Sequence, residues 1–217
     1  GLKIFSYTMS TAWDVSTASY DSKTITTGVG TSVNALYIGD SGSKLYIIDG
    51  ASKIWQYPLS TAYDITTIGS LTSSIAASTV TGAHSTTQGA AGLWMKPDGT
   101  ALWSVVQKCD DASDYNVVHW ALSTPWAVSS ASAVTAKSIH FGVGTAVNHD
   151  VDGGVYSLAG SFSPNGEYWV TQNQFTSATI YGAAILKCST PWDLSTASNF
   201  YTINMGSVVT NMDAYCF

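Results

Sequence analysis

One short segment occurs four times in the chain, and this internal repetition constrains the fold more than any other feature. The segment reads S-T-x-aromatic-x-(V/I/L)-(S/T)-(S/T), and its aromatic residue is Trp13, Tyr63, Trp126 or Trp192. The aromatic residues follow one another at steps of 50, 63 and 66 residues. A period of this size indicates that one supersecondary unit is used repeatedly.

Each repeat is preceded by a run of alternating apolar and polar residues, which is typical of a β-strand. A second repeated feature lies between these runs, where Asp-Gly or Asn-Gly or a related sequence separates two apolar stretches at 38–47, 95–104 and 162–170. Asp-Gly and Asn-Gly favour tight hairpin turns because these residues tolerate positive φ. The pattern therefore predicts four antiparallel strands per unit, as in a blade of a β-propeller.

We expect an all-β fold, a small β-propeller-like ring of about four antiparallel blades that forms a single domain over residues 1–217. Three blades are predicted to be full. The 13 residues that end at Trp13 and the 25 that follow Trp192 are too few for another full blade. We therefore expect the fourth blade to be shared between the N- and C-termini, which would lie side by side in one sheet.

Each repeated segment is predicted to follow the fourth strand of its unit, as the link to the next unit, and to have a structural role. We expect their aromatic residues to pack between neighbouring blades, with Trp13, Trp126 and Trp192 mostly buried. Asp14, Asp64 and Asp193 follow three of these aromatics. An Asp side chain in such a turn is expected to accept backbone N–H hydrogen bonds.

Composition and charge exclude several classes of function. The chain has 8 Lys, no Arg and 14 acidic residues, which gives a net charge of −6. Without a basic face, no nucleic-acid binding is expected. There is no apolar run of 18 residues, so no membrane insertion is expected. Cys109, Cys188 and Cys216 are widely spaced, and the sequence leaves open buried thiols or at most one disulfide.

The repeat resembles one found in the receptor-binding tail fibres and spikes of marine and other bacteriophages, including the spikes of corticovirus-type, membrane-containing marine phages. The residues that carry this resemblance are the W-D-(V/I/L)-S-T-A-S strings near Trp13 and Trp192 and the F-S-P-N-G segment at 162–166. Ala127 and Tyr63 depart from the pattern. The resemblance implies that the protein is displayed on the virion surface. The matched segments include no catalytic residues of the family.

The expected function is that of a non-enzymatic domain for host attachment, which would recognise a bacterial surface glycan or an outer-membrane component. Since the chain begins with Gly1, we expect it to be a piece of a longer chain whose missing flanks contact other virion proteins. Two alternatives stay open. One is a bacterial extracellular adhesin or lectin, and the other is a polysaccharide-degrading propeller enzyme.

Four long loops are the expected ligand-binding surface, at 80–91, 107–116, 142–154 and 171–180. They are rich in hydroxyl and amide side chains with interspersed aromatics, a mixture that suits sugar recognition. Plain variation in loop length explains each loop equally well. The candidate ligand-binding residues are His84, Gln88, Tyr115, Asn116, Gln172, Asn173 and Phe175.

One of these loops is also the best candidate for a Ca²⁺ site. Asn148, Asp150 and Asp152 place oxygen ligands at alternate positions before two glycines, which is how a calcium loop begins. The second choice is the acidic loop with Asp110, Asp111 and Asp114. The alternative to calcium is a solvated, Asp-rich turn. The four His residues show no zinc spacing, and His119 is expected to lie on a strand.

The segment Gly39-Asp-Ser-Gly42 is similar to the nucleophile site of a serine protease. It aligns, however, with the Asp-Gly turn at 98–99 and the Asn-Gly turn at 165–166. We therefore interpret Gly39-Asp-Ser-Gly42 as a hairpin turn.

Overall fold

The structure is a computed structural model, and it describes residues 2–29, 32–51, 53–76, 90–106, 108–109, 117–137, 155–175 and 180–204. The described residues form strands and single turns of 3-10 helix, with no α-helix among them. The strands are β1 (Lys3–Met9), β2 (Ala18–Thr26), β3 (Val33–Gly39), β4 (Lys44–Asp49), β5 (Lys53–Pro58), β6 (Ser73–Ala76), β7 (Ala90–Met95), β8 (Ala101–Val106), β9 (Lys108–Cys109), β10 (Val117–Leu122), β11 (Ala131–Lys137), β12 (Val155–Phe162), β13 (Tyr168–Phe175), β14 (Ile180–Cys188) and β15 (Ala197–Asn204).

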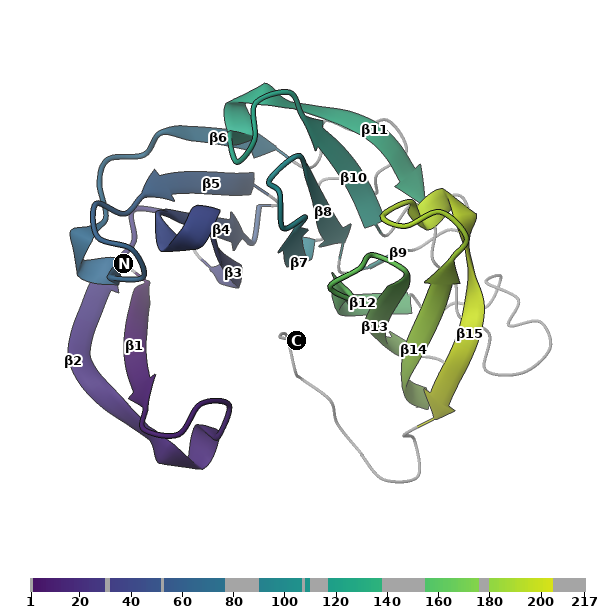
Figure 1. The fold of residues 1–217 in the computed structure, drawn as a ribbon, viewed down its shortest axis with the longest axis horizontal. Helices are drawn as coiled ribbons and strands as arrows, with labels where there is room; N and C mark the ends of the chain where they lie inside the picture. The colour runs from purple at the N-terminus through teal and green to yellow at the C-terminus, as the bar shows by residue number, and fades with distance from the viewer. Residues whose placement is uncertain are drawn as a thin grey trace.

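These strands form four antiparallel sheets that follow one another along an arc (Figure 1). The first blade has the order β3-β4-β5-β6, the second β7-β8-β10-β11 and the third β12-β13-β14-β15. β3, β7 and β12 lie on the inside of the arc, and β6, β11 and β15 lie on the outside (Figure 1). The predicted all-β, propeller-like class is therefore confirmed.

The fourth sheet consists of β1 and β2 alone, and we call it the half-blade. By their position relative to the repeated segment, β1 and β2 correspond to the third and fourth strands of the full blades. The C-terminal strand that was predicted to join this sheet falls at 205–217, outside the described residues.

The repeated segment does not link one blade to the next. It connects the third strand of a blade to the fourth strand of the same blade, as between β5 and β6 or between β14 and β15. Each segment forms a tight turn and then a single 3-10 turn, which Asp14, Asp64 and Asp193 cap by accepting from the backbone N–H two residues later. The predicted role of these three Asp residues is confirmed.

The turns between the first and second strands also match the prediction. Gly99 and Gly166 adopt φ values of +73° and +74°, which a residue without Cβ tolerates best. In the first blade the turn is Asp40–Gly42, so the Gly-Asp-Ser-Gly segment is a hairpin turn. Its Ser41 adopts a left-handed backbone conformation in the turn that joins the paired strands β3 and β4.

Three of the predicted loops contain strand, and in the one predicted at 80–91 the last two residues already belong to β7. β13 runs to Phe175, although residues 171–180 were predicted to be a loop, because it pairs with both β12 and β14 along its length. Within the predicted loop 107–116, Lys108 and Cys109 form β9, which pairs with Tyr156 and Val155 of β12. A short segment that leaves the second blade thus covers the inner edge of the third.

The hydrophobic core is divided into three clusters, each in the contact between two consecutive sheets, which we call a seam. The first seam joins the half-blade to the first blade, the second seam joins the first blade to the second, and the third seam joins the second blade to the third. The buried residues of the seams include Ile4 and Leu45 in the first, Ile48 and Val118 in the second, and Trp103 and Leu186 in the third. The fold is held mainly by blade-to-blade burial.

The repeated aromatics pack as predicted in two cases. Trp126 lies against Gly39 of the first blade, and Trp192 stacks on Trp94 of the second blade. Both are partly buried. The prediction is wrong for Trp13, which is 95% exposed. In the described residues the half-blade lacks the first two strands, and with them the glycine turn on which this aromatic would rest.

Candidate active site at the third seam

The third seam is lined by aromatic rings from both blades. Trp94 of β7 stacks on Trp192 with ring centroids 5.4 Å apart and an interplanar angle of 18°. Phe162 at the end of β12 contacts Trp94, Trp103 and Trp192 at 4.9 to 5.3 Å. These rings pack mainly on one another, with Trp103 and Phe162 buried and Trp94 and Trp192 partly exposed at the boundary between the blades.

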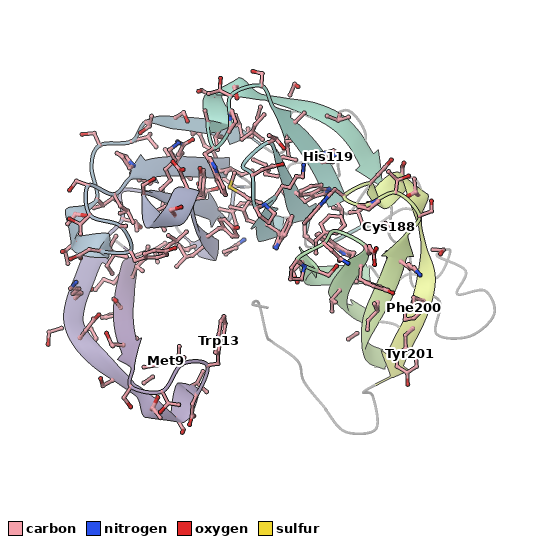
Figure 2. The ribbon with its side chains drawn as sticks, in the orientation of Figure 1. Met9, Trp13, His119, Cys188, Phe200 and Tyr201 are labelled. Carbon is pink, nitrogen blue, oxygen red and sulfur yellow. The ribbon has the colours of Figure 1, made fainter. Side chains whose placement is uncertain are left out.

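His119 of β10 lies in this seam (Figure 2). Its imidazole stacks on the indole of Trp103, with centroids 4.7 Å apart and planes within 7°. Burial lowers the pKa of His119 below its ordinary value of 6.5, while the Asp193 carboxylate opposes this effect and the Lys96 ammonium adds to it. The imidazole is therefore neutral at pH 7 and can accept a proton.

Lys96 follows β7 at the same seam. Its ammonium forms an ion pair with Asp98 at 2.7 Å and lies 5.8 Å from the ring centroid of Trp192. Burial alone would raise the pKa of Asp98, but hydrogen bonds from Lys96 and Thr100 outweigh it and hold that pKa at about 2. Asp98 is thus ionised over the physiological range and keeps Lys96 at the seam.

The seam therefore combines a neutral imidazole, a carboxylate close enough to affect it, an ammonium group and two partly exposed indole rings. Hydrolysis by an activated water needs a general base, a group that stabilises the resulting imidazolium and a cation that stabilises the developing oxyanion. The sequence placed His119 on a strand, which is confirmed, but it did not indicate these neighbours.

One signal in the sequence could have pointed to His119. His119 lies seven residues before Trp126, the aromatic residue of its repeated segment, just as Gln56 lies seven residues before Tyr63. The buried Gln56 accepts a hydrogen bond of 2.7 Å from the backbone N–H of Val128 in the next blade. A side chain seven residues before the repeated aromatic can therefore contact the following blade. Among the described third strands, only β10 of the second blade carries an ionisable side chain at this position.

Most residues predicted to bind a ligand or calcium lie outside the described residues. These are His84, Gln88, Tyr115, Asn116, Asp110, Asp111, Asp114, Asn148, Asp150 and Asp152. Gln172, Asn173 and Phe175 lie on β13 and not in a loop. Within the described part of the chain no group of three or more His, Cys, Asp or Glu side chains is arranged to hold a metal ion. No helix in that part is long and apolar enough to span a membrane.

Comparison with known proteins gives matches among solved structures alone, since no family model and no curated protein matches the chain. A protein from Lactobacillus plantarum has 14% identity and a TM-score of 0.52, over 92% of this chain and 48% of that one. A periplasmic gluconolactonase from Pseudomonas aeruginosa has 12% identity and a TM-score of 0.50, over 79% and 40%. The chain therefore spans about half the length of these structures, and the likeness shows the propeller fold.

These comparisons correct the predicted function. The expectation of a non-enzymatic receptor-binding domain is wrong, because the similar structure with a named activity is an enzyme, and neither structure is described as an attachment protein. The alternative of a propeller enzyme is favoured instead. The resemblance to phage spikes, the virion surface, the host glycan and the calcium ion stay untested predictions.

Proposed function

We propose that this chain carries a hydrolase activity toward a sugar-derived substrate, with the reaction at the third seam and His119 as the general base. The observation that supports it best is the position of His119, whose imidazole stacks on the buried Trp103 in the third seam, where burial lowers its pKa. Trp94 and Trp192 are both partly exposed beside these groups, and amphipathic aromatic side chains of this kind favour a sugar as the bound moiety.

A sugar lactone fits this set of groups. His119 takes a proton from water as the water oxygen adds to the lactone carbonyl carbon, and the Lys96 ammonium stabilises the oxyanion that forms. The Asp193 carboxylate stabilises the imidazolium. When the ring C–O bond breaks, the imidazolium returns its proton to the leaving alkoxide oxygen, which yields the hydroxy acid. The gluconolactonase activity of a structural neighbour supports the choice of a lactone as the first substrate.

The test measures hydrolysis of glucono-δ-lactone above its spontaneous rate, with release of reducing ends from bacterial polysaccharide as a second arm. The key variant is His119→Gln, because glutamine is the residue at the equivalent position of the first blade. We expect His119→Gln to keep the fold and lose about 100-fold or more in kcat. Lys96→Gln should also lower kcat, by about 100-fold.

The pH profile provides a second readout. Because burial lowers the pKa of His119, kcat should fall on the acid side with an inflection below the ordinary histidine value. Circular dichroism and the melting temperature serve as controls for folding. If the parent protein hydrolyses neither class of substrate above the buffer rate, or if His119→Gln retains full activity, the proposal is wrong.

A further inference from the structure

Most of the large exposed apolar side chains lie at the two ends of the arc. At one end they belong to the half-blade, where Figure 2 shows Met9 and Trp13. At the other end they belong to the third blade, where Figure 2 shows Phe200 and Tyr201. The half-blade set is Phe5, Tyr7, Met9, Trp13, Val15 and Tyr20. An exposed apolar patch of this kind marks a surface of interaction.

Three of the half-blade residues occupy positions that are buried in every full blade. Counted from Trp13, the aromatic of the repeated segment, Tyr7, Met9 and Val15 lie at positions −6, −4 and +2. Their side chains are 60%, 42% and 81% exposed. The same three positions in the full blades are at most 9% exposed. Their residues are Tyr57, Leu59 and Ile65, then Trp120, Leu122 and Val128, then Leu186, Cys188 and Leu194.

In the full blades these positions face the preceding blade. Val128, for example, packs in the cluster with Tyr46 and Ile54 of the first blade, and Leu194 packs in the cluster with Trp103 of the second. The half-blade therefore presents the face that elsewhere receives a preceding blade.

The third blade presents the complementary face. Tyr168 lies two residues after Gly166, as Ala101 lies two after Gly99, and Ala101 is buried in the third seam. Tyr168 instead packs against the exposed Phe200, with ring centroids 5.4 Å apart, and the Lys187 ammonium lies 5.8 Å from its ring centroid. This is the face on which the next blade would stack.

We propose that a second copy of this chain covers these two faces, with the half-blade of each copy stacked on the third blade of the other. The half-blade and the third blade lie at opposite ends of the arc (Figure 1). Each presents one of the two faces that together would form a seam. The chain also covers 48% and 40% of two structures with this fold, so two copies match the length of one propeller. Head-to-tail contacts of this kind close into a ring with two identical interfaces.

The apolar character of both faces supports a blade as the occupant. Tyr7, Met9 and Val15 are side chains of the kinds that the equivalent seams bury. Oligosaccharide binding would use the same aromatics, but it does not explain why the repeat register places them at seam positions. The interface is independent of the proposed hydrolase activity.

The experiment is sedimentation analysis of the parent chain and of Val15→Lys, together with a photo-crosslinking amino acid at position 7. We expect twice the monomer mass of 22.9 kDa. Val15→Lys should raise the dissociation constant of the dimer by at least about tenfold, because an ammonium would be buried against apolar surface. The control is Leu71→Lys, an exposed apolar residue outside both faces, which should leave the dimer intact.

The crosslink identifies the occupant. A crosslinked product of twice the mass, joined to a peptide from 168–201, supports the second copy. A crosslink within one chain, with a monomeric parent, would mean that the chain closes on itself and would overturn the proposal. A monomer that binds oligosaccharides through this face, with binding abolished by Val15→Lys, would also overturn it.

Discussion

The backbone N–H of Trp192 donates a hydrogen bond of 2.9 Å to the carbonyl oxygen of Gly166, and the indole of Trp192 covers the same glycine. Trp126 with Gly99 and Tyr63 with Gly42 repeat this relationship at 2.9 Å. The two short motifs that define the repeat, the aromatic segment and the glycine turn, are therefore partners at one end of each full blade.

Gly166→Ala should destabilise the protein by roughly 1–3 kcal/mol. The added Cβ would clash with the ring of Trp192, and φ at this position is +74°. Urea unfolding of the variant measures the change in the free energy of unfolding. Gly28→Ala is the matched control, because no heavy atom lies within 4 Å of a Cβ there. Equal stability of the two variants would show that the aromatic does not confine the glycine.

Gln56→Leu should cost about 1–3 kcal/mol, because it leaves the buried backbone N–H of Val128 without its acceptor. Ser73→Ala serves as the comparison, since it removes only the 3.3 Å hydrogen bond from the Ser73 hydroxyl to Gln56. Both free energies of unfolding can be measured in urea. A Gln56→Leu protein as stable as Ser73→Ala would mean that this contact between blades adds little to stability.

His119 should make the stability depend on pH. Since burial lowers the pKa of His119 in the folded protein, the unfolded chain binds the proton more readily. The free energy of unfolding should therefore hold its full value above pH 6.5 and decrease as the pH falls through the lowered folded pKa. His119→Gln should weaken this decrease. Parallel melting curves of the two proteins from neutral to acid pH would argue against it.

The calcium prediction concerns Asp150 and Asp152. If the ion binds there, about a hundredfold excess over the dissociation constant should stabilise the protein by about 2.7 kcal/mol. Thermal melting with EDTA and with about 10 mM CaCl₂, above the usual range for extracellular sites, tests this. Asp150→Asn/Asp152→Asn should lose the shift. An unchanged parent melting temperature would indicate a solvated turn, and an equal shift in both proteins would move the site to Asp110, Asp111 and Asp114.

The sequence alone determined most of the strands, the glycine turns and the number of sheets. The alternation before each link, the glycine turns and the capping Asp residues are local features, because they act between residues close together in the chain. For this reason the propeller class and the structural role of Asp14, Asp64 and Asp193 could be predicted from the repeat.

Only the tertiary structure decided which strands the link joins, which aromatics are buried and which groups surround His119. The seams are built from contacts such as Gln56 with Val128 and Tyr46 with Trp126, which are 72 and 80 residues apart. A local period carries no information on such distant neighbours. Trp13 and Trp126 occupy the same place in the repeat, yet among the residues that the structure describes only Trp126 has a glycine turn and a preceding blade against it. This difference in surroundings explains why Trp13 is more exposed than Trp126.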